Sequence, residues 1–378
     1  MKILHISPTD IRYDNRILKE INSLIQIPNC EVQAFGIFDY EGQDHEIKDS
    51  KNIRNFRMFS KELKILPKPI RYFLLLLEGF IKIFIPSYRY KPSVIHCHDT
   101  LFLPIAVLVK YLCNSKLIYD AHELESNKNG QSKINAYFTL KIEKLLWDKI
   151  DALICVSNSI NDWYVAEFGA KYSEVILNSP IIGNQQIIKS DNFSLRKKLG
   201  IREDEILFVY VGYFGLGRSI EILLESFTKM SQNLHIGFVG YGILKEKIEH
   251  YSKIYPNIHI TDKVPHEKLV SFIHGADVGF CLIENVSLSD YYCLPNKLFE
   301  YIFAGVKVIA SDFPELRNMC ERYKIGVVWD EKVEDIGELI PKLNLLGKID
   351  CELLYDFSWE FQEKKLISLY KNLIKSTI

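Results

Sequence analysis

Several features that often point to a function are missing from this chain of 378 residues. Its 47 Lys and Arg nearly balance its 48 Asp and Glu, so the net charge is −1 and we expect no nucleic-acid partner. Its eight cysteines include no closely spaced pair of the kind that binds zinc, and we expect reduced, buried thiols. The sequence has no Asp-x-Asp pair that would chelate a metal, so we expect neither a metal nor a cofactor.

A secretion signal and a membrane span are missing as well. The first residues, MKILHIS, have the pattern of a β-strand rather than of a charged, apolar and cleavable leader, so the cytoplasm is the expected compartment. The apolar run YFLLLLEGFIKIFIP, residues 72–86, carries Glu78 and Lys82 and is too short to cross a bilayer.

Strand-like and helical patterns do alternate from one end of the chain to the other, which predicts an α/β fold with parallel sheets and crossover helices. We expect strands at 2–7, 31–38, 52–59, 93–98, 116–121, 152–157 and 174–178, and again at 206–212, 234–240, 258–262, 278–283, 307–311 and 325–329. A chain of this length exceeds the usual limit of one core, so two domains of about 180 residues are expected. Residues 181–203 lose the strand pattern and gain polar residues, as a linker should.

One segment of the second half, LPNKLFEYIFAGVKVIASD at 294–312, combines a helix start, an amphipathic helix, a Gly stop and a β-branched strand. Asn296, Lys297 and Glu300 lie at or near the positive N-terminus of that helix, where an anion and its hydroxylated neighbour can be held. The pattern favours a nucleotide site. A buried αβ unit that only packs, with a solvated Lys297, is the alternative.

A glycine-rich turn follows the strand at 206–212. Gly212, Gly215 and Gly217 free the backbone, and Arg218 at the start of the next helix offers a permanent bidentate donor that suits a diphosphate. The alternative is a tight turn with a solvated Arg. A second turn, VGYGIL at 239–244, lacks the third Gly of a dinucleotide fingerprint, so it indicates proximity to a nucleotide and not NAD binding.

In the first half, polar residues follow two strands. His122 and Glu123 follow the strand at 116–121, and His98 and Asp99 end the strand at 93–98, where open α/β sheets bind ligands. A purely structural role for His122 is the alternative. His96 and His98 share one face of their strand, but a metal would need further ligands, and the sequence shows none. We therefore assign His96 to the core.

Taken in order, these segments resemble the family four glycosyltransferases, GT-B enzymes that transfer a sugar from a nucleoside diphosphate. The resemblance covers nearly the whole chain through the blocks KILHIS, DNRILKEINSL, SVIHCHDTLFLP, LIYDAHELES, IEKLLWDKIDALICVSNSI, VILNSP, VGYFGLGRSIEILLESF, VGYGILKEKIE, VPHEKLVSFIHGADVGFCLI and PNKLFEYIFAGVKVIASD. It implies two Rossmann-like doubly wound domains that face a cleft. The limits would be 1–180 for an acceptor-side domain, 204–355 for a donor-binding domain, and 356–378 for a last helix that crosses back to the first domain.

The resemblance also implies roles for individual residues. Donor binding would fall to Gly215, Gly217, Arg218, Asn296, Lys297 and Glu300, catalysis to His122, Arg218 and Lys297, and acceptor contacts to His98, Asp99 and Glu123. Glu300 resembles the second of two Glu separated by seven residues, which binds the donor ribose. Tyr292 stands where the first of that pair is expected, which puts the role of that carboxylate in doubt.

The implied activity is transfer of a sugar from a nucleotide sugar to a glycan or lipid-linked acceptor, with retention of configuration, in bacterial surface polysaccharide or glycolipid synthesis. Two alternatives stay open at this point. A GT-B sugar-nucleotide epimerase would share the donor site without an acceptor. A non-catalytic nucleotide-sugar-binding subunit would explain the missing first Glu.

Residues 61–92 stand out by charge, because seven Lys or Arg and two Glu give this segment +5 in a nearly neutral chain. A basic amphipathic segment with aromatic residues is typical of docking on an anionic membrane, here the inner face of the cell membrane. A helix whose apolar face covers the sheet of the first domain is the alternative.

Overall fold

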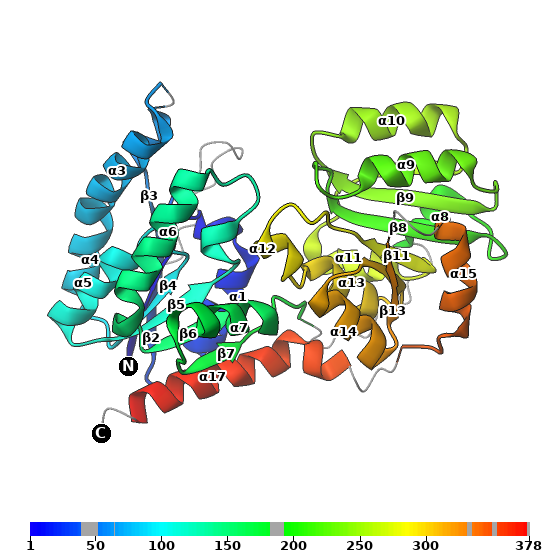
Figure 1. Cartoon of the computed structure of the whole chain (residues 1–378). Coiled ribbons are helices and arrows are strands. Elements are labelled where there is room, and N and C mark those ends of the chain that lie inside the picture. Colours follow the sequence, from blue (N-terminus) through cyan, green and yellow to red (C-terminus); the bar gives the residue numbers. More distant parts are fainter. Residues whose placement is uncertain (39–51, 64, 182–192, 331–334, 350–353, 376–378) are drawn as a thin grey trace. The chain divides into compact units, whose positions relative to one another are not determined.

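The computed structural model describes residues 1–38, 52–63, 65–181, 193–330, 335–349 and 354–375, and it divides into two compact units (Figure 1). The first unit contains Met1–Ile176 and Glu363–Ile378, and the second contains Leu177–Gln362. Each unit is built on one parallel sheet with crossover helices, which confirms the predicted α/β class with two Rossmann-like units. Of the predicted linker, 181–203, residues 182–192 lie outside the described residues.

The sheet of the first unit has seven parallel strands in the order β3-β2-β1-β4-β5-β6-β7. They are β1 (Lys2–Ile6), β2 (Glu31–Ile37), β3 (Ile53–Phe56), β4 (Val94–His98), β5 (Lys116–Ala121), β6 (Ala152–Cys155) and β7 (Ser173–Val175). The strand order reverses between β1 and β4, and such a switch point is where doubly wound sheets bind ligands. The register pairs His5 of β1 with His96 of β4.

The helices of the first unit are η1 (Ile11–Tyr13), α1 (Asn15–Ile25), α2 (Phe59–Glu62), α3 (Lys68–Gly79), the π-helical η2 (Phe80–Phe84), α4 (Ile85–Tyr90), α5 (Leu103–Cys113), η3 (Glu125–Asn127), α6 (Lys133–Leu146), η4 (Trp147–Lys149) and α7 (Asn158–Phe168). The basic segment 61–92 therefore contains three consecutive helical segments, α3, η2 and α4. Pro86 has no N–H to bond to Lys82, which agrees with a π-helical turn just before it. Among the described residues, no helix combines the length and the apolar character needed to cross a membrane.

The sheet of the second unit has six parallel strands in the order β10-β9-β8-β11-β12-β13. They are β8 (Ile206–Tyr213), β9 (Leu234–Tyr241), β10 (Ile258–Asp262), β11 (Val278–Cys281), β12 (Lys307–Ser311) and β13 (Gly326–Trp329). The helices are α8 (Leu195–Leu199), α9 (Ile220–Lys229), α10 (Lys245–Ile254), α11 (His266–Ile273), α12 (Leu288–Tyr291), α13 (Asn296–Phe303), α14 (Pro314–Tyr323), α15 (Ile336–Leu345) and η6 (Tyr355–Phe357). The switch point lies between β8 and β11.

Alternation along β8 divides the core of the second unit into two layers. Phe208 packs with α9, α10 and α15, whereas its neighbour Val209 packs with α11, α13 and α14 on the opposite face. Both faces of the sheet are covered, and its central strands β8 and β11 are accordingly apolar along most of their length.

The last helix, α17 (Trp359–Lys375), starts in the second unit and continues in the first from Glu363. Its predicted apolar stripe is buried and consists of Trp359, Leu366, Leu369, Tyr370 and Leu373. Within the first unit, the hydroxyl of Tyr370 lies 2.7 Å from Nδ1 of His96.

Candidate functional site

The predicted residues of the second unit lie in the segments that follow β8 and β11. After β8 the chain turns sharply at Gly217, with φ of +76°, and at Ser219, with φ of +54°. Glu284 fixes this turn, because its N–H donates to the carbonyl of Gly217 at 3.1 Å and its carboxylate accepts from the N–H of Ser219 at 3.3 Å. The sequence analysis missed Glu284, which stands only three residues after β11.

Close packing of backbone requires glycine beside this turn. A side chain at Gly240 would place its Cβ 1.9 Å from the carbonyl oxygen of Gly212. One at Gly242 would meet the carbonyl oxygen of Phe214 at 2.5 Å. The VGYGIL segment therefore lets the end of β9 lie against the turn that carries Arg218, which is a structural reason for its two glycines.

Arg218 remains partly accessible within this arrangement. Its side chain is 35% exposed, and its Nη1 lies 3.7 Å from Oδ1 of Asp290. Asp290 is held in turn by the hydroxyl of Ser287, which donates to its Oδ2 at 2.8 Å. At 3.7 Å this pair leaves the guanidinium able to bind a second anion.

Helix α13 presents the other predicted residues. Asn296 and Lys297 form its first turn, and among the described residues no side chain caps its N-terminus. The ammonium of Lys297 lies 4.1 Å from the ring centroid of Tyr210, which fixes it by a cation–π contact. Glu300 is nearly buried, and its Oε1 lies 3.3 Å from Nδ1 of the more exposed His266.

The charges of Arg218 and Lys297 both influence the pKa of two thiols, those of Cys281 and Cys293. Burial raises the pKa of Cys281 to about 12, and the charges of Lys297 and Arg218 oppose this rise. Burial also raises the pKa of Cys293, and both cations again oppose the effect. Arg218 and Lys297 thus both lie within electrostatic range of these two thiols of the second unit.

In the first unit, a buried ion pair organises the corresponding edge. Arg16 of α1 is 3% exposed and Asp120 of β5 is not exposed, and their Nη2 and Oδ1 atoms lie 3.0 Å apart. Arg16 also donates through Nη1 to the carbonyl of Ile176 at 2.9 Å. Asp14 caps α1 by accepting from the N–H of Arg16 and of Ile17, so the guanidinium is fixed at the first turn of the helix.

His122 lies directly beside this pair. Its Nε2 is 3.4 Å from Oδ2 of Asp120 and 3.0 Å from Nδ1 of His98, and the side chain is 17% exposed. Burial opposes a charge on His122, but the carboxylates of Asp120 and Asp99 raise its pKa to about 9. The imidazole is thus protonated near neutral pH and can donate a hydrogen bond outward.

The residues predicted on the acceptor side divide into two groups. His98 is completely buried, and burial lowers its pKa to about 4, so it can influence a ligand only through His122. Asp99 and the exposed Glu123 instead gather around Lys128, whose Nζ lies 3.7 Å and 4.0 Å from their carboxylates. Lys128 also pairs with Glu125 at 2.6 Å. The sequence analysis missed both Lys128 and Glu125.

His5, Arg16 and Glu20 were missed as well, and the sequence holds a signal only for Arg16 and Glu20. Arg16 and Glu20 stand four residues apart on one helix, where side chains meet, and their Nε and Oε1 atoms are 3.2 Å apart. Burial and the charge of Asp120 raise the pKa of Glu20 to about 8. His5 lies opposite His96 in the parallel register, which a single strand does not reveal.

Family profiles match both units. The one described as Glycosyltransferase Family 4 matches residues 30–179, and the one described as Glycosyl transferases group 1 matches residues 191–350. The uncharacterised glycosyltransferase MJ1069 of Methanocaldococcus jannaschii is 23% identical over 369 residues, which cover 93% of this chain and 85% of that protein.

Solved structures share the fold over the full length. Sucrose-phosphate synthase of Thermosynechococcus elongatus superimposes with a TM-score of 0.75 at 18% identity, covering 100% of both chains. HepE of Anabaena, solved with UDP-glucose, gives a TM-score of 0.70 at 11% identity and covers 98% of this chain and 100% of its own.

Proposed function

Because the chain belongs to the glycosyltransferases of the GT-B fold, we propose that it moves a sugar from a nucleoside-diphosphate sugar to a glycan or lipid-linked acceptor. The product would be a surface polysaccharide or glycolipid. The observation that carries this proposal is the accessible cation pair of the second unit, Arg218 and Lys297, beside the carboxylate of Glu300.

The second unit would bind the nucleotide part of the donor. Arg218 offers two parallel donors to the diphosphate, and Lys297 with the N-terminus of α13 adds positive field on the same oxygens. Glu300 would accept hydrogen bonds from the ribose hydroxyls, and Gly215 and Gly217 would let the phosphates approach the backbone. Asp290 would orient Arg218 and supplies a carboxylate near the position of the missing first Glu.

The transfer step needs stabilisation of the charge that develops as the diphosphate leaves. The bond from the anomeric carbon to the phosphate oxygen breaks, the acceptor oxygen bonds to that carbon, and the acceptor proton passes to the departing phosphate. Arg218 and Lys297 stabilise the leaving group in this step. In the first unit, His122, held by Asp120, would offer a hydrogen bond to a sugar hydroxyl. We propose retention of configuration and a hexose donor, without a catalytic metal.

A panel of nucleotide sugars with and without acceptor extracts tests this proposal. UDP-glucose comes first, because the HepE relative was solved with it. Release of nucleoside diphosphate that requires an acceptor supports transfer. Conversion of the donor alone to an isomer would instead support an epimerase, and binding without turnover a non-catalytic subunit.

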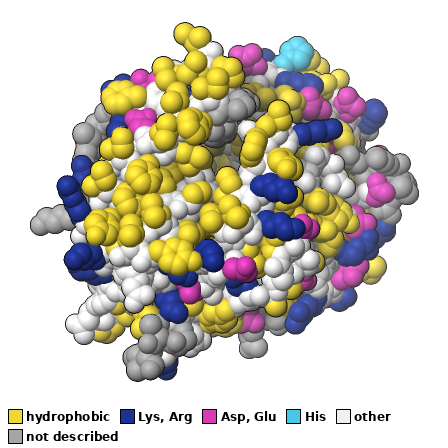
Figure 2. All heavy atoms as spheres, turned by 60° about the vertical axis from the view of Figure 1, so that its left-hand side comes forward, with side chains coloured by type: hydrophobic (Ala, Val, Ile, Leu, Met, Phe, Trp, Pro, Cys, Tyr) yellow, Lys and Arg dark blue, Asp and Glu magenta, His cyan; other side chains and the backbone are white. Residues whose placement is uncertain are grey.

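We propose further that the acceptor is met at a membrane, through a surface on α3, η2 and α4 that we call the α3–α4 surface. Its exposed apolar side chains are Ile70, Phe73, Leu77, Phe80, Ile81, Ile85 and Tyr88. Figure 2 shows hydrophobic side chains gathered over this face, with Lys and Arg mainly toward its margins. Exposed apolar groups on this scale are typical of an interaction site rather than of a solvated helix.

The structure alters the expected role of one cation in this surface. Lys82 is paired with Glu78 at 2.7 Å, and Glu78 also accepts from the N–H groups of Phe59 and Ser60. Burial works against the charge of Glu78, but the bonds from Lys82 and Ser60 hold its pKa at about 2. Lys82 is therefore committed to the fold. Arg89 and Lys91 are exposed and remain able to attract anionic lipid.

Vesicle co-sedimentation tests the membrane proposal. Binding should require anionic lipid, weaken with salt, and fall in a Phe73→Ser, Ile81→Ser double variant. Arg89→Gln and Lys91→Gln should each cost about 1 kcal/mol of binding. Leu345→Ser, which removes an exposed apolar side chain from the second unit, is the matched control. Absence of binding at low ionic strength, or equal binding to neutral vesicles, would refute the proposal.

A further inference from the structure

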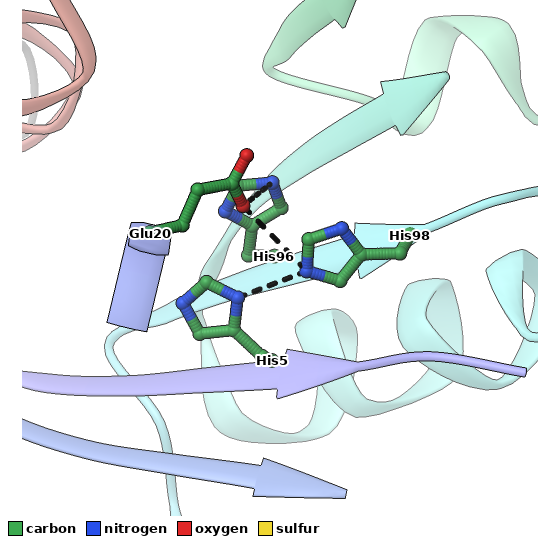
Figure 3. Close-up of side chains that lie close together, drawn as sticks. All are labelled: His5, Glu20, His96 and His98. Atoms are coloured by element: carbon green, nitrogen blue, oxygen red, sulfur yellow. Dashed lines mark hydrogen bonds and ion pairs between the residues drawn. The ribbon is translucent and has the colours of Figure 1, made fainter. Parts of the chain in front are cut away.

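Behind His122, the first unit holds a cluster that the proposed transfer does not use. His5 of β1, Glu20 of α1, and His96 and His98 of β4 are all completely buried. Figure 3 shows the three imidazoles and the carboxylate close together, with Glu20 beside His96 and His98, and Nδ1 of His5 2.9 Å from Nε2 of His98. Each residue offers one ligand atom, and these atoms lie within 4.8 Å of one another. The strand register and the first helix bring them together from three separate segments.

The cluster is incompletely bonded. Among the described residues, Nε2 of His5 and both carboxylate oxygens of Glu20 have no hydrogen-bond partner, although all three atoms are buried. Arg16 forms an ion pair with Oε1 of Glu20 at 3.2 Å, which leaves Oε2 facing the imidazoles. Buried polar atoms without hydrogen-bond partners are rare and cost folding free energy, so these atoms of His5 and Glu20 need an explanation.

The surroundings of the cluster are those of a metal site. The second nitrogen of a metal-bound imidazole is commonly held by a carboxylate or another polar group. Here Nδ1 of His96 lies 2.7 Å from the hydroxyl of Tyr370. Nδ1 of His98 lies 3.0 Å from Nε2 of His122 and 3.5 Å from Oδ2 of Asp120. The Nε2 atoms of these two histidines lie 3.7 Å and 3.9 Å from Oε2 of Glu20.

We propose that His5, Glu20, His96 and His98 bind one Zn²⁺ ion through three imidazole nitrogens and one carboxylate oxygen. Imidazole ligands favour zinc over magnesium or calcium, and four protein ligands fill a tetrahedral shell. In such a shell, with bonds of about 2.0–2.1 Å, the ligand atoms are roughly 3.3 Å apart. The three imidazole rings are stacked on one another, so binding requires the rings to turn until each aims one nitrogen at the ion. Because the residues are fully buried, the ion is structural and joins β1, β4 and α1 behind His122.

This proposal departs from the prediction made from sequence, which found no ligands to accompany His96 and His98. The missing ligands are His5 and Glu20, which are remote in the chain and adjacent in the fold. The proposal is also independent of the reaction, since a structural ion in the first unit requires neither donor nor acceptor.

Metal content of the full-length protein is the first test. The protein is unfolded in denaturant that contains a chelator, and it is then refolded with or without one equivalent of Zn²⁺. After a desalting column, the zinc content and the midpoint of thermal unfolding are measured for both samples. We expect one zinc per chain and a higher midpoint for the zinc-refolded sample. Less than about a tenth of an equivalent of zinc with an unchanged midpoint would overturn the proposal, and the polar cluster would then be a hydrogen-bonded network alone.

Variants locate the ion. Tyr370→Phe removes only the hydroxyl beside His96 and should weaken Zn²⁺ binding by about 10–100-fold. Glu20→Gln removes a ligand and should weaken it further. His259→Gln is the control, because Nε2 of His259 lies 3.1 Å from Nδ1 of His235 in the second unit and His259 is not one of the proposed ligands. Wild-type affinity in Glu20→Gln, or loss of zinc in His259→Gln, would show an adventitious ion and overturn the assignment.

Discussion

The two sheets share one parallel topology, but they use charge in opposite ways at the ends of their strands. At the first edge, Arg16 and Asp120 are buried and lie 3.0 Å apart. At the second edge, Arg218 is 35% exposed and lies 3.7 Å from Asp290. Charge that is already paired and buried supports the fold, whereas charge that stays accessible can bind an incoming anion. The first edge is thus built of paired, buried charge, whereas the second keeps a cation that is partly accessible.

Arg16→Met should have the largest effect on stability. It leaves the carboxylates of Asp120 and Glu20 buried without their cation, which should lower the free energy of unfolding by about 3–5 kcal/mol. The same change at the second edge, Arg218→Met, should cost about 0–1 kcal/mol. Urea denaturation of both variants, followed by circular dichroism, measures the difference. Equal losses would remove the distinction between the two edges.

Arg218→Ala should show the reverse pattern in activity. Loss of a cation that acts on the leaving diphosphate should reduce kcat by about 10²–10³-fold while the protein stays folded. Arg317→Ala removes an exposed, paired Arg from α14 of the same unit and serves as the control. Steady-state kinetics with the donor identified by the panel measure kcat for the wild type and for both variants. An unchanged kcat in Arg218→Ala would refute the role of Arg218 in the reaction.

Glu143 provides a pH test of the buried charges in the first unit. Burial raises its pKa to about 7, although Tyr164 and Tyr119 donate hydrogen bonds to its carboxylate. The folded protein therefore binds this proton more tightly than the unfolded chain. The resulting contribution, about 3 kcal/mol, is complete below pH 4.5 and is lost as the pH rises to about 7.

The variant Glu143→Gln should remove this part of the pH dependence. Stability is measured by urea denaturation at intervals from pH 4.5 to 8 for both proteins, and the difference isolates Glu143 from the other titrating groups. A wild-type slope that persists in Glu143→Gln would show that this carboxyl does not titrate in that window.

Sequence predicted the fold well because the information is local. Apolar β-branched runs identify every strand of the two sheets, and the segment 294–312 contains its whole helix and strand. The short helices α2, α8 and α12 were not predicted. The same locality explains why Lys297 and Glu300 could be placed together. Pro86 was overlooked as the cause of a π-helical turn, because the flanking apolar pattern is continuous.

The buried cluster could not be predicted, because it depends on the register of β1 against β4 and on the packing of α1. Neither His5 nor Glu20 belongs to a recognisable spacing with His96. The complete burial of His98 could not be predicted from sequence either. A side chain at the end of a strand can be exposed, or it can be covered by a neighbour such as His122. Which buried atoms lack a partner becomes visible only in three dimensions.

The most direct test of the central claim is calorimetric titration of nucleoside diphosphates, UDP first, into the wild-type protein and into Glu300→Ala. Glu300 should accept charge-assisted hydrogen bonds from the ribose, so its loss should weaken binding by about 1.5–3 kcal/mol. Glu321→Ala, which removes an exposed carboxylate from the same unit, should bind as the wild type does. A selective loss in Glu300→Ala is the predicted result. Equal affinity in all three proteins, or no binding of any nucleoside diphosphate, would contradict the assignment of the donor site to this edge.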